Sequence, residues 1–387
     1  MQLSSRVQQV KPSLTLAITA KAKQMRKDGL DVISLSAGEP DFDTPDFIKN
    51  AAIKALKDGC TKYTPASGVE QLKELIIQKF QKDNNISYEM SDIVVSNGAK
   101  HSIYNIFQVL LNEGDEVIIP APYWLSYPEI IRLSGGTPVI LETKQEDRFK
   151  VKPADLKSKI TDKTKAIIVN SPSNPTGVIY SEDELREIAQ IAVENNIFII
   201  SDEIYEKLIY GDKKHVSIAS FGEAEKKLTF TVNGLSKAYS MTGWRLGYLA
   251  GPKEITSKIT SLQSHSTSNP NSFAQYGAIE ALANGEEENK KMRKIFEARK
   301  ALMLEHLSHL PKVSTVEPDG AFYAFVNISE TGLTSSEFSD QLLEKEKVAV
   351  VPGAVFGSDA HIRLSFATSD ENIIKGVARI KSFINSL

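Results

Sequence analysis

Short apolar runs alternate with longer amphipathic stretches from Asp92 to Gly251, and this alternation limits the fold more than any other feature of the sequence. The apolar runs read, in order, DIVVS, EVIIP, TPVIL, KAIIVN, IFIIS, LTFTV and RLGYLA. Between them lie stretches with helical spacing, such as KHSIYNIFQVLL and EDELREIAQIAVENN. Strands joined through helices run mostly parallel, and the helices cover both faces of the sheet. The pattern predicts an α/β fold that binds its ligands at the carboxyl ends of the strands.

The pattern changes near residue 286. A long charged helix is followed by GAFYAFVNI, KVAVVP and HIRLSFA, which alternate as in an antiparallel or mixed sheet beside helices. The first 45 residues contain one sheet-like run, DVISLSAG. We therefore predict a large domain of residues 46–285 and a smaller α+β domain made of residues 1–45 and 286–387.

Charge and cysteine content exclude several classes of partner. The 46 basic and 49 acidic side chains give a net charge of −3, which provides no field for attracting nucleic acid or a membrane surface. Cys60 is the single cysteine, and no paired Cys and His spacing indicates a metal site. No signal-peptide pattern and no apolar run of about 18 residues is present, so we expect a cytoplasmic protein that binds neither membranes nor nucleic acid.

The strongest local signal is GLSKAYSMTGWRLG at residues 234–247, directly after the strand-like LTFTVN. A lysine is ordinarily a solvated surface charge. Lys237, however, has small and apolar neighbours, which would remove water from its amine and lower its pKa toward that of a nucleophile. The context therefore favours a chemical role for this lysine.

This segment resembles the signature of the class I aminotransferases, in which G-x-R-apolar-G follows the lysine. The resemblance covers nearly the whole chain and implies fold type I of the transferases dependent on pyridoxal 5'-phosphate, with a mostly parallel seven-stranded sheet in the large domain. It also implies that Lys237 binds the cofactor covalently and later moves the α proton, and that Arg245 grips the cofactor phosphate. Many relatives have a hydroxyl residue three positions before the lysine, whereas this chain has Gly234; a backbone donor or Ser236 would have to replace it.

Two further motifs follow predicted strands. The first, SDEIY, contains Asp202 and Tyr205. An acid at such a position is often a helix cap. The resemblance implies instead that Asp202 pairs with the pyridine nitrogen and that Tyr205 reaches the phenolate oxygen of the cofactor. NSPSNPTG would ordinarily be a turn. The resemblance implies that Asn174 contacts the phenolate oxygen and the substrate carboxylate, with a cis bond before Pro175.

The segment VVSNGAKHSIYNIF runs from a strand into a helix. An ordinary connecting loop is the simplest interpretation. Its geometry, however, directs free backbone N–H groups and the positive end of a helix dipole toward any phosphate near Gly98, Ala99 and Lys100. The resemblance assigns cofactor binding to the same positions.

Ring stacking and subunit sharing follow from the resemblance alone. Trp124 in APYW matches the aromatic residue that lies over the pyridine ring and beside the substrate, although a tryptophan is more often part of the core. Tyr63 in KYTPASG matches a tyrosine that reaches the phosphate of the neighbouring subunit. Together they imply a homodimer with shared active sites.

The substrates implied are an amino acid and a 2-oxo acid. Arg363 in HIRLSFA and Gly38 in SAGEPDF match the positions that hold the α-carboxylate. No arginine lies between Leu246 and Met292, where one would otherwise meet a distal carboxylate, and the chain instead resembles a bacterial subgroup in which a lysine does so. In that subgroup, Lys100 meets the acidic side chain. The N-terminal positions that close over it are Lys11 and Thr15.

The implied reaction transfers the amino group of L-aspartate to 2-oxoglutarate by a ping-pong mechanism, and some members of the subgroup also use prephenate. An aromatic, branched-chain or broad-specificity aminotransferase and a β-lyase would share the same core residues. A non-catalytic regulatory module that binds the cofactor would carry an additional DNA-binding region, for which we find no segment. No G-x-G-x-x-G follows the first strand and no Ser/His/Asp pattern is defensible, which argues against a dehydrogenase and a hydrolase.

Overall fold

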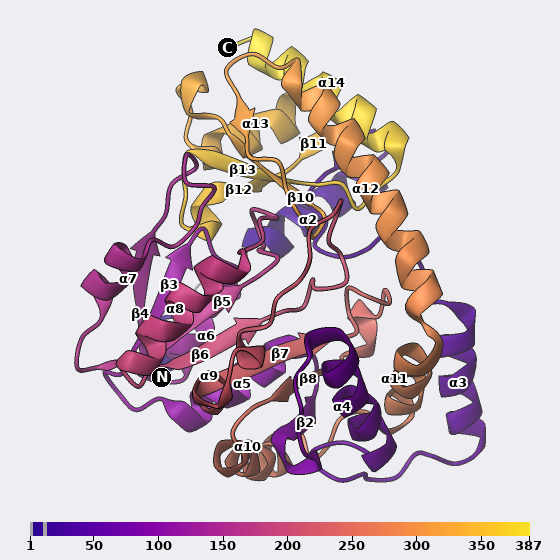
Figure 1. Cartoon of the computed structure of the whole chain (residues 1–387). Helices are drawn as coiled ribbons and strands as arrows, with labels where there is room; N and C mark the ends of the chain where they lie inside the picture. Colours follow the sequence, from indigo (N-terminus) through magenta and orange to yellow (C-terminus); the bar gives the residue numbers. More distant parts are fainter. Residues whose placement is uncertain (1–2, 11–13) are drawn as a thin grey trace.

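A seven-stranded sheet forms the centre of the computed structural model, which describes residues 3–10 and 14–387 (Figure 1). Its order is β2-β8-β7-β6-β5-β3-β4; β8 is antiparallel to both neighbours and the other pairs are parallel. The predicted α/β fold with a mostly parallel sheet is thus confirmed. The strands are β2 (Ile93–Ser96), β3 (Glu116–Ala121), β4 (Thr137–Glu142), β5 (Thr164–Asn170), β6 (Phe198–Asp202), β7 (Thr229–Gly234) and β8 (Gly247–Ala250).

Helices pack on both faces of this sheet because its strands are apolar on both sides. Ile118 and Ile119 are neighbours in β3, yet their side chains lie in two different hydrophobic clusters. Ile119 packs with residues of α5, α6 and α10, and Ile118 packs with residues of α7 and α8. The helices that surround the sheet are α3 (Asp46–Lys57), α4 (Glu70–Asn84), α5 (Ala99–Leu110), α6 (Ser126–Leu133), α7 (Pro153–Lys159), α8 (Glu182–Glu194), α9 (Glu223–Leu228), α10 (Lys253–Ser266) and α11 (Ser272–Asn284).

A second group of elements packs around smaller sheets. One has four strands in the order β12-β13-β10-β9, and the other pairs β1 with β11 in parallel. The first forty-five residues therefore contribute a strand beside the C-terminal part of the chain. The elements are α2 (Leu14–Lys27), β1 (Ile33–Ser34), α12 (Glu286–Ser308), β9 (Ser314–Thr315), β10 (Tyr323–Asn327), α13 (Ser335–Glu346), β11 (Val348–Ala349), β12 (Val351–Pro352), β13 (His361–Ser365) and α14 (Asp370–Asn385). Helix α1 (Ser5–Gln8) contacts α6 of the first group instead.

Helix α12 runs along one side of the molecule between the two groups (Figure 1). It begins at Glu286, with Gly285 as its N-cap residue, so the long charged helix expected there is confirmed. The division into residues 46–285 and residues 1–45 with 286–387 stays a prediction. No helix in the described part of the chain is long and apolar enough to cross a membrane.

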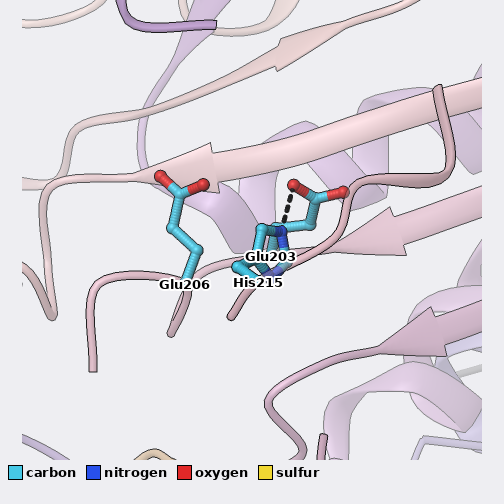
Figure 2. Close-up of side chains that lie close together, drawn as sticks. All are labelled: Glu203, Glu206 and His215. Atoms are coloured by element: carbon cyan, nitrogen blue, oxygen red, sulfur yellow. Dashed lines mark hydrogen bonds and ion pairs between the residues drawn. The ribbon is translucent and has the colours of Figure 1, made fainter. Parts of the chain in front are cut away.

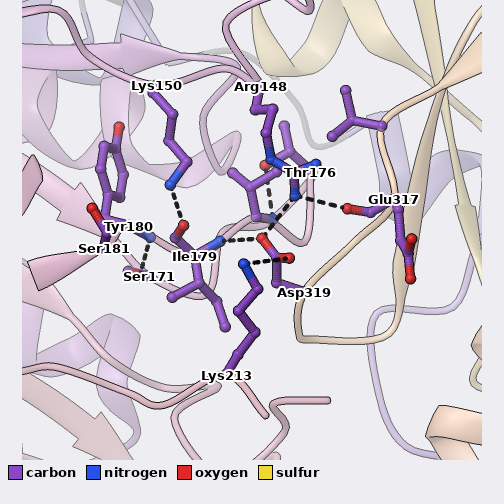
Figure 3. Close-up of polar contacts among 12 residues, drawn as sticks. Arg148, Lys150, Ser171, Thr176, Ile179, Tyr180, Ser181, Lys213, Glu317 and Asp319 are labelled. Carbon is purple, nitrogen blue, oxygen red and sulfur yellow. Dashed lines mark hydrogen bonds and ion pairs between the residues drawn. The ribbon is translucent and has the colours of Figure 1, made fainter. Parts of the chain in front are cut away.

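Asp319 joins loops from both groups (Figure 3). Its Oδ2 accepts hydrogen bonds from Nη2 of Arg148 at 2.9 Å and from the amide of Ile179 at 3.2 Å, and its Oδ1 lies 3.8 Å from Nζ of Lys213. Its own amide donates to the carbonyl of Gly177 at 2.9 Å. These contacts hold the loop that contains Asn174 and Gly177 against the segment that leads into β10.

Candidate active site

A cavity of about 340 Å³ lies where β3, β5, β6 and β7 end, the edge of the sheet where ligands were expected. The second group of elements closes it with Tyr323 from β10 and Arg363 from β13. Ten of the residues singled out in the sequence line this cavity. They are Gly38, Ala99, Lys100, Trp124, Asn174, Asp202, Tyr205, Lys237, Arg245 and Arg363.

Lys237 lies three residues after β7, partly exposed to the cavity. The flanking Leu235 and Ala238 are buried in the core, which fixes the backbone on either side of the lysine. Its Nζ donates a hydrogen bond to the carbonyl of Gly38 at 2.6 Å. Burial lowers the pKa of this amine to about 8, against the opposing effect of Glu39. A substantial fraction of Lys237 is therefore uncharged, and nucleophilic, near neutral pH.

Asp202 ends β6 with a fully enclosed carboxylate. Tyr127 donates its hydroxyl proton to Oδ2 at 2.7 Å, and the amide of Ile204 donates to Oδ1 at 3.3 Å. Burial raises the pKa of Asp202 to about 6, while these two hydrogen bonds oppose the rise. Near pH 6, Asp202 is therefore divided about equally between its charged and neutral forms.

Tyr205 and Tyr323 meet across the cavity. Their hydroxyl oxygens lie 2.9 Å apart, and both side chains are buried. Burial raises the pKa of each phenol, most strongly that of Tyr205. Both therefore remain protonated; one hydroxyl donates to the other, whose own proton can be donated to a ligand oxygen.

Arg363 is a buried cation directed at the cavity from β13. The guanidinium donates through Nη1 to Oδ1 of Asn174 at 3.0 Å and through Nη2 to the carbonyl of Ser36 at 3.1 Å. Its Nε is buried and has no partner among the described residues. An unpaired buried donor lowers the stability of the protein, so this arrangement favours an anionic ligand that pairs with the guanidinium. The peptide bond from Asn174 to Pro175 is cis, as expected from the sequence.

Helix α5 points its N-terminus at the cavity from the end of β2. The amides of Ala99 and Lys100, in its first turn, have no acceptor among the described residues. Gly98 is the N-cap residue at φ 95°, and a Cβ there would lie 2.4 Å from Nη2 of Arg245, so only glycine lets the guanidinium approach this turn. Free amides, a helix dipole and an arginine together form a phosphate-binding arrangement.

Lys100 and Trp124 share one wall of the cavity. Nζ of Lys100 lies 4.9 Å from the centre of the Trp124 ring, a cation–π distance. Burial, followed by the charge of Arg245, lowers the pKa of Lys100. Its side chain thus lines the cavity while it is still exposed.

The remaining predicted site residues are Tyr63, Lys11 and Thr15. Tyr63 is 88% exposed on the surface and does not line the cavity. Lys11 lies outside the described residues, and only the backbone of Thr15, in α2, is described. Ser236, considered as a substitute for the hydroxyl absent at Gly234, does line the cavity.

Six cavity residues were missed in the sequence: Leu125, Tyr127, Asn170, Ile204, Thr242 and Tyr323. Asn170 ends β5, so its position at a carboxyl end was a usable signal. Tyr127 lies three residues after Trp124, at the start of α6, and its closeness in the chain to that predicted residue was a usable signal. Tyr323 is an ordinary strand residue in GAFYAF, and nothing local distinguishes it.

A buried charged cluster lies behind the site (Figure 2). Glu203, Glu206 and His215 place possible metal-ligating atoms within 4.8 Å of one another. The protein itself pairs their charges, because Nε2 of His215 lies 2.8 Å from Glu203 and the ammonium of Lys79 contacts Glu206. Ser201 and Ser217 also donate to Glu203, at 2.9 and 2.6 Å. The arrangement is that of an internal ion-pair network.

The fold and the cavity define a transferase whose reactive group is the amine of a lysine. Comparison with known proteins gives its family. A model of "Aminotransferase class I and II" matches residues 30–380, so the chain belongs to this family of pyridoxal-phosphate-dependent transaminases.

Particular relatives are similar over their whole length. The chain is 52% identical to the aspartate aminotransferase of Bacillus subtilis, with 99% of each chain covered. It is also 52% identical to a probable aspartate/prephenate aminotransferase of Aquifex aeolicus, over 100% of this chain and 99% of that one. Among solved structures, the aspartate aminotransferase from Thermus thermophilus with maleate matches with a TM-score of 0.95 and 43% identity over 100% of both chains.

Proposed function

We propose that this aminotransferase acts on L-aspartate and 2-oxoglutarate, giving oxaloacetate and L-glutamate in two half-reactions. The observation that carries the proposal is the buried Arg363, which lines one cavity together with Lys237 and Lys100. Arg363 provides a fork for the α-carboxylate, and Lys100 provides a second cation for the carboxylate of the substrate side chain. Relatives named as aspartate aminotransferases support this assignment.

The donor set of the cavity fits pyridoxal phosphate. Arg245 and the free amides of Ala99 and Lys100 would hold the phosphate, and Gly98 permits their close approach. Asp202 would hold the ring nitrogen, Tyr205 and Asn174 would hold the phenolate oxygen, and Trp124 would contact the ring. When bound, pyridoxal phosphate supplies the electron sink that stabilises negative charge at the substrate α carbon.

Lys237 carries out the proton chemistry in this proposal. Lys237 would hold the cofactor through Nζ, and its amine, once free, would serve as the general base and acid for the proton on the substrate α carbon. Its lowered pKa keeps a useful fraction of the amine free to accept that proton. The hydrogen bond to Gly38 holds Nζ beside the place where Arg363 binds the carboxylate.

Residues near the N-terminus complete the proposed substrate site. We assign Lys11 and Thr15 to a segment that closes over the acidic substrate, and Gly38 to a backbone contact beside the α-carboxylate. The dicarboxylate maleate in the Thermus thermophilus structure is consistent with an acidic substrate, and the Aquifex aeolicus relative makes prephenate a second one to assay.

A homodimer with shared sites is part of the same proposal. Tyr63 is 88% exposed, and Ile53 and Leu56 on α3 are exposed by 47% and 43%. Ile53 and Leu56 line a surface hollow together with Trp244 and Phe273. A second copy that covers this apolar surface would bring Tyr63 to the phosphate of its partner. Light scattering of the purified protein tests the dimer, and cofactor affinity of Tyr63→Phe tests the shared site.

Titration of the cofactor absorbance with amino acids tests the substrate assignment. L-aspartate should convert the bound cofactor to its amine form at lower concentration than L-phenylalanine. Lys100→Met should lower kcat/KM for aspartate by about 10- to 100-fold, as for loss of one hydrogen-bonded charge, and change that for phenylalanine little. Lys375→Met, which removes an exposed lysine paired with Glu371 on α14, is the matched control. Preference for phenylalanine in the wild type would replace the proposal with an aromatic aminotransferase.

A further inference from the structure

Tyr127 makes the shortest hydrogen bond to Asp202. Its side chain, in the first turn of α6, is 1% exposed, and its hydroxyl lies 2.7 Å from Oδ2 of Asp202. Burial and the negative charge of Asp202 raise the pKa of this phenol well above its usual range. The hydroxyl therefore keeps its proton and donates it to Asp202 whenever that group is ionised.

The other contacts of Asp202 hold it less firmly. Its Oδ1 accepts one bond, from the amide of Ile204 at 3.3 Å. The charged and titratable groups that face the carboxylate are Glu203, Lys237 and Tyr205, besides the phenol of Tyr127. Glu203 raises the pKa of Asp202, whereas Lys237 and the bond from Tyr127 lower it. The hydrogen bond from Tyr127 therefore offsets part of the rise that burial causes in the pKa of Asp202.

The ring of Tyr127 has a separate role from its hydroxyl. It meets the ring of Trp124 edge-on, with centroids 5.3 Å apart at 87°. Replacement by phenylalanine retains this ring contact and removes the hydroxyl alone, so the two roles can be separated.

We propose that Tyr127 is a positioning residue for Asp202, whose hydroxyl fixes the carboxylate and keeps it ionised so that it can hold a protonated ring nitrogen. The inference rests on the role proposed above for Asp202. No proton leaves Tyr127 in this role, and its contact to the cofactor is through Asp202 alone.

The test compares Tyr127→Phe with Tyr88→Phe. Tyr88 is also a buried tyrosine, but its hydroxyl lies 3.3 Å from Oγ1 of Thr231 and makes no hydrogen bond to Asp202 among the described residues. In the cofactor-free protein, carbon-13 NMR of labelled aspartate follows the Asp202 carboxyl, assigned by its loss in Asp202→Asn. Tyr127→Phe should raise the pKa of Asp202 by about one pH unit or more, the effect of one hydrogen bond to a charged group, and Tyr88→Phe should not.

In the holoenzyme of Tyr127→Phe, the acidic limb of the pH profile of kcat should move to higher pH by the same amount. The pH titration of the cofactor absorbance should move with it. KM for aspartate should stay within about threefold of wild type. Tyr127→His, which retains a shorter N–H donor, should give a smaller displacement. A lowered Tm with an unmoved Asp202 titration would overturn the proposal, because Tyr127 would then only stabilise the fold. If Asp202→Asn itself retains cofactor affinity and kcat, the role of Asp202 fails, which is a different result from failure of Tyr127.

Discussion

The guanidinium of Arg363 is joined to Oδ1 of Asn174 at 3.0 Å, so the cation on β13 and the loop after β5 form one recognition surface. The two residues are 189 positions apart in the chain. Because Nη1 and Nη2 are occupied by Asn174 and Ser36, the position of the fork is fixed before any ligand arrives.

Arg363→Lys tests whether a positive charge alone is enough at this position or whether the planar guanidinium is also needed. Lysine keeps the positive charge but cannot form two parallel hydrogen bonds to a carboxylate, so kcat/KM for aspartate should fall about 100- to 10,000-fold. Steady-state kinetics measure the loss, and cofactor affinity should stay within a few-fold of wild type. Arg299→Lys is the control, since Arg299 is another enclosed arginine, paired with Asp41 and Asp370. Equal losses in both variants would contradict a specific role for Arg363.

The reactivity of Lys237 should follow its lowered pKa of about 8. At pH 7 about a tenth of such an amine is uncharged, against a few parts in ten thousand for an ordinary lysine. In the cofactor-free protein, the rate of modification of Lys237 by an amine reagent, followed by mass spectrometry, should rise through pH 8 and then level off. Lys49, whose pKa is raised by its hydrogen bond to Asp46, should react only at much higher pH and serves as the internal reference. A midpoint for Lys237 above pH 10 would show that burial does not set its pKa.

The sequence predicted the parts of the site that depend on strand ends and on the motif of the family. Asp202 and Lys237 follow apolar strands, and parallel strands end at one edge of a sheet, so their meeting was predictable. Arg363 lies in a different sheet and was placed by resemblance, since no local pattern says where β13 packs. The bond from Tyr127 to Asp202 spans 75 positions and depends on how α6 lies on the sheet, which local periodicity does not fix.

Asp319 should matter for stability although it is outside the cavity (Figure 3). Asp319→Ala removes two ion pairs and leaves the partly buried amide of Ile179 without an acceptor, which should cost about 1 to 3 kcal/mol. Asp319→Asn keeps an acceptor oxygen and should cost less. Urea denaturation of both variants measures the loss. Glu317→Ala, which removes one exposed carboxylate paired with Lys300, should change stability by less than about 1 kcal/mol. A loss as large in Glu317→Ala as in Asp319→Ala would locate the effect in surface charge.

The charged cluster behind the site should make stability depend on pH in both directions (Figure 2). Burial raises the pKa of Glu206, but the charges of Lys79, His215 and Lys207 outweigh it and lower the pKa to about 2. Its contribution is therefore complete above about pH 4.5, its ordinary value, and is lost as the pH falls toward 2. His215 shows the opposite sign: burial lowers its pKa, but Glu203 outweighs burial and raises it above 6.5. Its contribution is complete below about pH 6.5 and is lost as the pH rises through the raised pKa.

Glu206→Gln and His215→Gln should remove these two dependences separately. Glu206→Gln should cost about 3 to 5 kcal/mol near pH 6, because it leaves the enclosed ammonium of Lys79 unpaired, and the loss should shrink below pH 4. His215→Gln should flatten the decline above pH 6.5. Urea denaturation at pH 3.5, 5.5 and 8.5, values chosen around those pKa limits, measures the free energy of unfolding of each variant.

The control is Glu286→Gln: the pKa of Glu286 is also lowered to about 2, by Lys82 and Lys290, but its side chain is 55% exposed. Solvent screens such a pair, so this variant should lose at most about 1 kcal/mol. If Glu206→Gln costs no more than Glu286→Gln, burial does not strengthen the pair with Lys79, and the pH dependence must arise elsewhere.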